Sequence, residues 1–269
     1  MKHLLTKFLS PLLLLGTLAI VWDCRVNAEG TNAPKRLLVV TVTKGFRHAS
    51  IATGEKVVAE LARKSGAFTV DFVRTDEDMA KKMTPEALKN YDGVFFLNTT
   101  GTLPLPDKAG FLDWIKSGKA FIGTHSATDT FHGVNGVDPY IDMIGAEFTS
   151  HTVAKVDCIN QDPKHPATRH LGATYTVFDE IYVMKNFSRE KVHGLLMLNH
   201  APGSDRPGDY PISWCKKYGE GNVFYTSLGH EDAVWESGDF QLHLLGGIKW
   251  ALGLEKGGAT PQAVSAAKP

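Results

Sequence analysis

The feature that most constrains the fold is an apolar run at residues 36–43, RLLVVTVT, in which leucines and β-branched residues follow one another without apolar–polar alternation. Such a run is typical of a parallel strand, which is buried on both faces. A helical pattern follows, with Ser50 as its expected N-cap and Gly66 at its end. Further strand-like segments, separated by helical patterns, lie at residues 68–75, 93–100 and 119–123. This alternation predicts an α/β fold with a doubly wound, mostly parallel sheet.

The second half of the chain has a different rhythm, because its strand-like segments have little helix between them. They lie at residues 151–160, 179–187, 192–200, 211–219 and 221–229. Consecutive strands of this kind predict an antiparallel C-terminal extension, or edge strands added to the parallel core. An amphipathic helix is expected at 239–253, with Leu242 and Ile248 packing on the sheet. Residues 255–269 are small, polar and proline-containing, which predicts a disordered tail.

The first 28 residues have the pattern of a signal peptide. Two lysines precede an uncharged stretch from Phe8 to Trp22, which is short for a bilayer-spanning helix of ~20 residues. Small residues before the end of the segment predict cleavage after Ala28. An uncleaved anchor and a lipoprotein attached through Cys24 are the alternatives. We expect the mature protein to be exported to the periplasm or the medium, without stable membrane insertion.

Composition excludes some classes of partner. The chain has 29 basic and 29 acidic residues, so bulk charge does not favour nucleic acid. The first strand is not followed by G-x-G-x-x-G, and no nucleotide cofactor is expected. Cys158 and Cys215 lie in predicted strands, where we expect unpaired core thiols, although an oxidising compartment would allow them to pair. The sequence does not indicate an oligomeric state.

Polar clusters follow the predicted strands at their carboxyl ends, where open parallel sheets bind ligands. Four histidines belong to these clusters: His48, His125, His151 and His230. A single loop histidine is usually only a solvated polar group, but four at strand ends predict a shared crevice. Imidazoles there can transfer protons near neutral pH or hold a divalent ion such as zinc.

Other residues of the same clusters are candidates for binding and orientation. Asp129 is expected to orient an imidazole or to bind sugar hydroxyls, and Lys44 and Arg47 to engage an anionic group. The remaining candidates for substrate contact are Ser126, Glu231 and Trp235. Two weaker candidates are His132, which can simply cap a turn, and Glu147, which can lie exposed. Histidines 165 and 170 are interpreted as parts of a structural turn.

An ordered series of motifs carries a family resemblance. The motifs are VTKGFRHASI, GTHSATDTF, GAEFTSH, HPAT, DEIY, PISWCKKYGEGNVFYTSLGHEDAVW and LLGGIKWALG. In this order they resemble the trehalose-utilisation (ThuA-like) family, and the resemblance defines a domain at residues 36–254. It implies a flavodoxin-like fold similar to that of class I glutamine amidotransferases.

The amidotransferase chemistry itself is not expected. Amidotransferases have a nucleophilic cysteine at the turn after a central strand, whereas this turn reads Gly-Thr-His-Ser at residues 123–126. Glutamine hydrolysis through a thiolate is therefore not expected. Ser126 would need His125 or His230 as a base, and no G-x-S-x-G motif surrounds it.

The resemblance implies a role in the catabolism of trehalose-like glycosides, with 3-keto-sugar intermediates. A ketone at C3 acidifies the C2 proton, so a positioned imidazole can remove it while the C1 substituent leaves. A cation would stabilise the enolate. The catalytic candidates are His48, His125, Asp129 and His230, and the candidate metal ligands are His48, His125, His151 and His230. A non-catalytic carbohydrate-binding or sensing module, or an accessory subunit of a sugar oxidoreductase, is the alternative.

Overall fold

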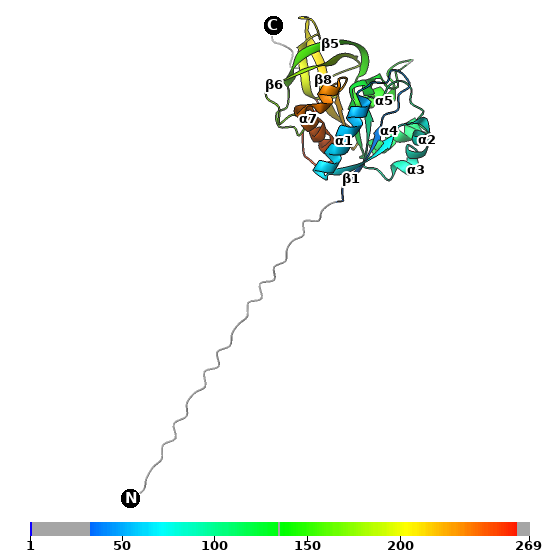
Figure 1. The fold of residues 1–269 in the computed structure, drawn as a ribbon, viewed down its shortest axis with the longest axis vertical. Helices are drawn as coiled ribbons and strands as arrows, with labels where there is room; N and C mark the ends of the chain where they lie inside the picture. Colours follow the sequence, from blue (N-terminus) through cyan, green and yellow to red (C-terminus); the bar gives the residue numbers. More distant parts are fainter. Residues whose placement is uncertain (2–32, 134, 263–269) are drawn as a thin grey trace. The chain divides into compact units, whose positions relative to one another are not determined.

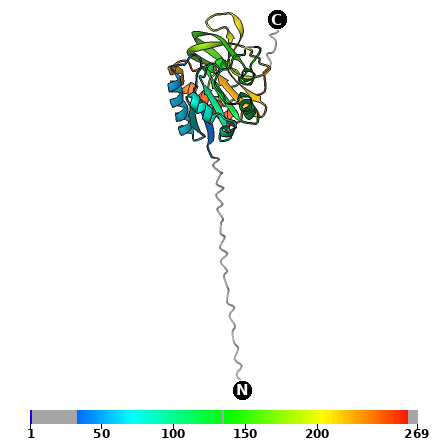
Figure 2. The same ribbon diagram turned by 90° about the vertical axis from the view of Figure 1, so that its right-hand side faces the viewer.

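The computed structural model describes Met1, residues 33–133 and residues 135–262. The predicted signal peptide therefore lies outside the described residues. All helices and strands belong to the unit Pro34–Pro269. Its centre is a nine-stranded mixed sheet in the order β2-β1-β3-β4-β9-β8-β7-β5-β6 (Figures 1 and 2). The expected α/β architecture is confirmed.

One half of the sheet is parallel, as the continuous apolar runs predict. It contains β1 (Lys35–Val40), β2 (Phe68–Val73), β3 (Gly93–Leu97), β4 (Ala120–Thr124) and β9 (Gly221–Thr226). Every residue of β3 and of β4 is buried. These strands place all their carboxyl ends along one edge, where the polar clusters follow.

Helices cover both faces of the parallel half. Alternate strand residues divide between two cores, with Leu37 and Val39 in one and Leu38 and Val40 in the other. The first core is closed by α1 (Ile51–Ser65), α6 (Asp232–Glu236) and α7 (Gly238–Ala251), and Figure 1 shows α1 beside α7. The second is closed by α2 (Asp76–Lys82), α3 (Pro85–Leu88), α4 (Lys108–Lys116) and α5 (Pro139–Ile144).

The other half of the sheet is antiparallel. It contains β5 (Glu147–Asn160), β6 (Thr174–Lys185), β7 (His193–His200) and β8 (Pro207–Tyr218). The last strand, β9, was expected in the antiparallel extension, but it pairs antiparallel with β8 and parallel with β4. It is therefore the junction between the halves. Cys158 and Cys215 are free and buried in this half.

Two local expectations need correction. Ser50 precedes α1, but its hydroxyl makes no cap bond within the helix and donates instead to the carbonyl of Gly229, 3.0 Å away. Leu242 is half exposed, and Leu244 and Ile248 are the leucine and isoleucine that α7 buries. Gly66 does end α1, in the left-handed conformation.

The beginning of the expected tail contacts the domain. The imidazole of His193 bonds the carbonyl of Thr260 at 2.9 Å, and Gln262 accepts a hydrogen bond from the Gly194 amide at 3.1 Å. Residues 260–262 thus contact β7, and residues 263–269 lie outside the described part. Within the described ranges, no helix has both the length and the hydropathy needed to cross a bilayer.

Candidate functional site

Backbone strain marks the end of strand β4. His125 follows this strand with φ 45°, and it begins the 3₁₀ helix η1 (His125–Asp129). Asn98, after the neighbouring β3, has φ 50°, and its side-chain oxygen accepts a hydrogen bond from the Thr124 hydroxyl at 2.8 Å. Left-handed non-glycine residues cost about 1–2 kcal/mol and persist where surrounding contacts fix them, often at functional sites. The turn therefore presents the imidazole of His125 in one fixed direction.

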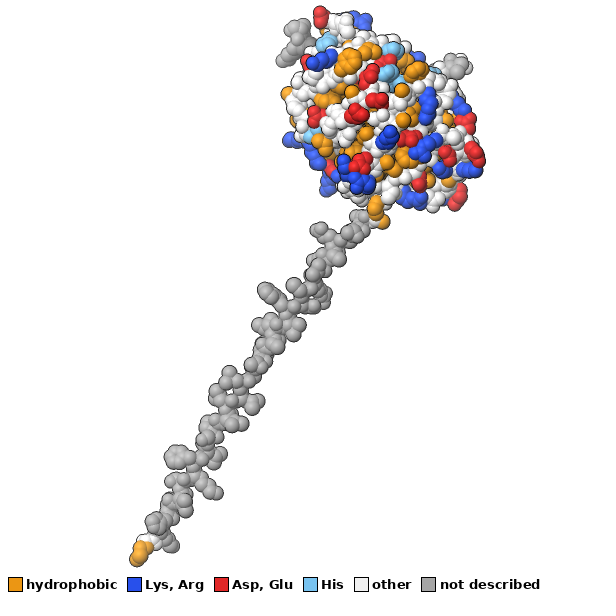
Figure 3. Space-filling model, in the orientation of Figure 1, with side chains coloured by type: hydrophobic (Ala, Val, Ile, Leu, Met, Phe, Trp, Pro, Cys, Tyr) orange, Lys and Arg blue, Asp and Glu red, His pale blue; other side chains and the backbone are white. Residues whose placement is uncertain are grey.

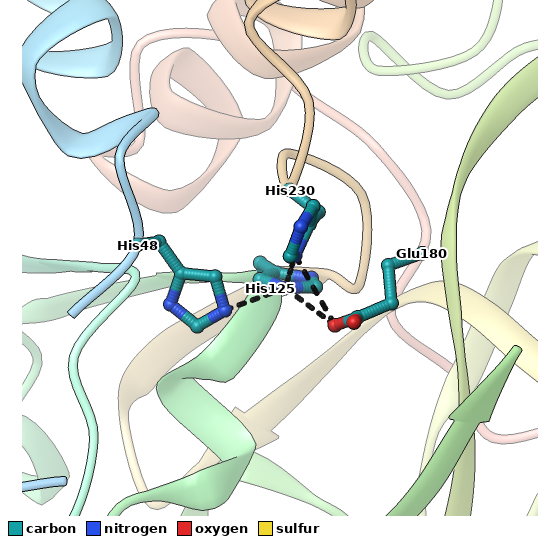
Figure 4. Close-up of side chains that lie close together, drawn as sticks. All are labelled: His48, His125, Glu180 and His230. Atoms are coloured by element: carbon teal, nitrogen blue, oxygen red, sulfur yellow. Dashed lines mark hydrogen bonds and ion pairs between the residues drawn. The ribbon is translucent and has the colours of Figure 1, made fainter. Parts of the chain in front are cut away.

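Three imidazoles and one carboxylate converge at this point (Figure 4). The Nε2 atom of His125 lies 3.2 Å from Nε2 of His48 and 3.3 Å from Nδ1 of His230. Glu180, on β6, brings Oε2 to 3.4 Å from His125 Nε2 and to 3.2 Å from His230 Nδ1. One ligand-type atom from each of the four residues lies within 4.8 Å of the others.

The outer ring nitrogens of two imidazoles fix their orientation. His125 donates from Nδ1 to the carbonyl of Ser227 at 2.8 Å, which leaves the lone pair of Nε2 facing the cluster. Nδ1 of His48 lies 3.3 Å from the Ser126 hydroxyl, an arrangement that likewise directs Nε2 inward. Both rings are buried. Ring nitrogens of both imidazoles thus face the centre of the cluster.

Electrostatics favour the metal-binding protonation states of two members of the cluster, His48 and Glu180. Burial, reinforced by the neighbouring His125 and His230, lowers the pKa of His48 to about 3, so this imidazole is neutral at pH 7. Burial opposes ionisation of Glu180, but its close contact with His125 and the adjacent His230 and His151 outweigh this effect and lower its pKa. A neutral His48 and an ionised Glu180 are the ligand states that a divalent cation requires.

The position of His151 differs from the prediction. Its Nδ1 atom bonds Oε1 of Glu180 at 2.9 Å, on the far side of the carboxylate from the three imidazoles. Glu180 therefore takes the fourth position that we had assigned to His151, and His151 orients Glu180. The other three predicted ligands, His48, His125 and His230, do meet.

The loop that carries His230 is held by the carbonyl of Gly229. This oxygen accepts hydrogen bonds from the Asn98 amide at 2.8 Å, the Trp235 indole at 2.9 Å and the Ser50 hydroxyl at 3.0 Å. On the other side, Asp179 accepts from the amides of Gly229 at 2.7 Å and of Glu231 at 3.1 Å. The buried Asp179 thus links β6 to the loop of His230.

An open pocket of about 410 Å³ lies over the cluster. Its lining combines the His–Glu cluster with aromatic and acidic side chains: Phe46, His48, Asp129, Phe148, His151, Glu180, Tyr182 and His230. A bulge in β5 after Phe148 turns both Phe148 and His151 toward this pocket, where both rings lie near Tyr182. On the face drawn in Figure 3, histidine atoms reach the surface among acidic and hydrophobic side chains.

Several predicted substrate contacts are engaged elsewhere. Lys44 pairs with Asp76, and the guanidinium of Arg47 donates to the carbonyl of Thr41 at 2.7 Å. Trp235 is fully buried, so its ring is not free to stack on a sugar.

The last two candidates for substrate contact also lie outside the pocket lining. Ser126 is buried beside His48, and Glu231 contributes its backbone amide to Asp179.

Asp129, by contrast, does line the pocket, and the two weaker candidates are attached to it. His132 bonds Asp129 through Nε2 and Oε1 of Glu147 through Nδ1, the latter at 2.7 Å. Glu147 is 2 % exposed, which corrects the alternative that it lies on the surface. His165 and His170 lie outside the pocket lining, as expected.

Sequence reasoning missed Glu180 because the residue lies within a strand and not after one. The signal was nevertheless present, since two consecutive carboxylates, Asp179 and Glu180, interrupt an apolar strand-like segment. A strand can bury such groups only with partners.

Comparison with known proteins gives a consistent family signal. Residues 36–251 match the ThuA family, described as trehalose utilisation. A ThuA-like protein from Bacteroides uniformis superimposes with a TM-score of 0.64 at 21% identity, over 84% of this chain and 94% of the other. A ThuA-like protein from Parabacteroides merdae gives 0.64 at 18% identity, over 81% and 90%.

A more distant likeness concerns the fold alone. A β-galactosidase from Bacillus circulans gives a TM-score of 0.52 at 12% identity, and the match covers 85% of this chain but 32% of the enzyme. No curated protein sequence matches the chain.

Proposed function

The chain belongs to the ThuA family of trehalose utilisation, and from this premise we propose that it is an exported enzyme of sugar catabolism. It cleaves or hydrates trehalose-like glycosides or their 3-keto forms. The site uses a divalent cation, with zinc as the first candidate, bound by His48, His125, His230 and Glu180.

The observation that carries the proposal is the spacing of the four ligand atoms. Tetrahedral zinc with ligands at 2.0–2.1 Å separates neighbouring ligand atoms by about 3.3 Å. Four of the separations in the cluster are 3.2, 3.3, 3.2 and 3.4 Å. The outer hydrogen bonds of His125 and Glu180 supply the oriented second shell that such centres need.

The bound cation would act as a Lewis acid for a carbonyl or hydroxyl oxygen of the sugar. The protein's own residues bind and orient the substrate. Phe46, two-thirds exposed beside His48, and the ring of Phe148 present apolar faces to the pocket, against which the C–H face of a pyranose can pack. Asp129 accepts hydrogen bonds from sugar hydroxyl groups.

The fold and the location of the protein belong to the same proposal. The strand order 2-1-3-4-9 of the parallel half supports a flavodoxin-like, doubly wound core, with β9 in the place of a fifth strand. The amino-terminal pattern of lysines and apolar residues supports export.

Metal analysis of the purified protein, together with turnover assays, tests this function. We expect close to one tightly bound zinc per chain, loss of that metal in Glu180→Ala, and retention in His170→Gln, whose imidazole bonds the carbonyl of Asp239 outside the cluster. Turnover of trehalose, methyl α-glucoside or their 3-keto forms should depend on the metal. A protein that binds these sugars without turnover would instead be a binding or sensing module, and one that binds neither metal nor sugar would contradict both functions.

A further inference from the structure

The proposed metal centre leaves the pocket in need of a separate proton acceptor. If the lone pairs of His48, His125 and His230 are used as ligands, none of these imidazoles can serve as a base. Three ionisable residues of the lining remain outside the ligand set: Asp129, His151 and Tyr182. His151 already bonds Glu180, and the phenol of Tyr182 is buried with its pKa raised by burial. Asp129 is the remaining candidate.

The side chain of Asp129 is attached to a built chain of polar groups. His132 bridges its carboxylate to that of Glu147, with 2.7 Å between Nδ1 and Oε1 of Glu147. Glu147 is itself fixed, because its Oε2 accepts from the Asn186 amide at 2.9 Å and its Oε1 pairs with Lys185 at 3.0 Å. A buried carboxylate thus anchors an imidazole that contacts a carboxylate in the pocket.

The backbone around Asp129 is fixed as well. Its carbonyl accepts a hydrogen bond from the Gly101 amide at 2.8 Å, and the Phe131 amide donates to the Gly101 carbonyl at 3.2 Å. These bonds tie the end of η1 to the loop after β3. Asp129 is therefore fixed by the hydrogen bond of its backbone to Gly101 and by the contact of its carboxylate with His132.

We propose that Glu147, His132 and Asp129 form a relay in which Asp129 is the proton-accepting catalytic residue and the other two are positioning residues. The inference rests on the proposed function. The hydrogen bonds of His132 to Glu147 and Asp129 outweigh the opposing effect of burial and raise its pKa, which favours the imidazolium form. His132 contacts one oxygen of Asp129, and in the proposed relay the other oxygen accepts the proton of the substrate.

The proposed reaction is balanced without any further reactant. Asp129 takes the proton from the carbon next to a sugar ketone, and the electron pair of that C–H bond forms a C=C bond as the glycosidic C–O bond breaks. Asp129 then returns the proton to the departing oxygen. The products are an unsaturated keto sugar and a free alcohol, and the carboxylate is regenerated.

The test compares kcat, KM and metal content of the purified protein and four variants on 3-keto-trehalose. Asp129→Asn should lower kcat at least 100-fold, whereas His132→Gln and Glu147→Gln should lower it about 10-fold with little change in KM. Metal content should be unchanged in all of them. The matched control is Asp162→Asn, which removes a carboxylate–imidazole pair with His193 beyond the other end of β5. Its kcat should stay within twofold of the wild-type value.

The pH profile separates positioning from a purely structural role. His132→Gln removes the positive charge that His132 can carry beside the proton acceptor, so the acid limb of kcat should move to higher pH. An Asp129→Asn variant that keeps half of the wild-type kcat would overturn the relay while leaving the metal centre intact. Inactivity of the wild type on all the sugars would overturn the proposed function and the role of Asp129 together, and a His132→Gln profile with an unmoved acid limb would overturn the positioning role.

Discussion

Two groups of histidines in this molecule differ in what their ring nitrogens face. In the crevice, nitrogens of His48, His125 and His230 point at one another and at a carboxylate. At the far end of the antiparallel half, His193 is paired with Asp162 and with the carbonyl of Thr260. His243, on the buried side of α7, bonds the carbonyl of Ala167.

The difference is the convergence of ring nitrogens on one point. The imidazoles of the second group contact carbonyl and carboxylate oxygens as hydrogen-bond donors, and the ring nitrogen of this group that has no partner, Nε2 of His243, is buried by itself. The crevice imidazoles offer acceptors to one another, which is unfavourable unless a proton or a cation lies between them. Proximity of histidines alone is therefore a weak criterion for a site, whereas convergence of acceptors is a strong one.

The largest expected effect comes from the central imidazole. His125→Ala should abolish metal retention and lower kcat at least 1,000-fold, because His125 lies within 3.4 Å of the other three ligands. His193→Gln should keep both the metal and the activity. Metal analysis and turnover assays check the pair, and equal metal loss in the two variants would break the comparison.

A second variant tests whether Asp179, which is not a proposed ligand, holds the loop of His230 in place. Asp179→Asn replaces a buried carboxylate that accepts two backbone amides beside His230. Metal affinity, measured by competition with a chelator, should fall about 10- to 100-fold, while the fold is retained. An unchanged affinity would show that the loop keeps His230 in place without Asp179.

The buried histidines outside the crevice should affect how the free energy of unfolding depends on pH. Burial lowers the pKa of His243 to about 3, below the 6.5 of an unfolded imidazole. The unfolded chain therefore binds a proton that the folded chain does not, and the free energy of unfolding falls as pH drops from 6.5 toward 3. Each such imidazole contributes up to about 1.4 kcal/mol per pH unit.

His243→Asn removes one of these titrations and keeps a donor for the Ala167 carbonyl. Urea unfolding of metal-free protein between pH 6.5 and 4 should show a shallower loss of stability in the variant than in the wild type. Identical slopes would mean that His243 is protonated in the folded protein as well.

The smallest effect is expected at Lys44, a predicted substrate contact whose ammonium pairs with Asp76 on the surface. Lys44→Ala should change kcat/KM less than twofold, since exposed ion pairs contribute little and the residue does not line the pocket. A loss of tenfold or more would show that the lysine turns toward the substrate.

The spacing of strand-like and helical segments predicts the two halves of the sheet, and the parallel half in turn predicts that three histidines meet. Parallel strands collect their carboxyl ends at one edge, so the loops of His48, His125 and His230 must be neighbours. Glu180 could not be found in this way, because it comes from the interior of an antiparallel strand whose register is set by pairing across a hairpin. Trp235 was misjudged because its polar neighbours in the sequence hide its packing against Phe240.

The division of the site between the two halves of the sheet has a practical consequence. The β5–β6 hairpin supplies Glu180 and the pocket wall of Phe148, His151 and Tyr182, while the three imidazoles come from loops of the parallel half. The hairpin is thus a replaceable module. Grafting a different hairpin that retains Glu147, His151, Asp179 and Glu180 would give new specificity on an unchanged trio of histidines, which makes this scaffold a starting point for directed evolution.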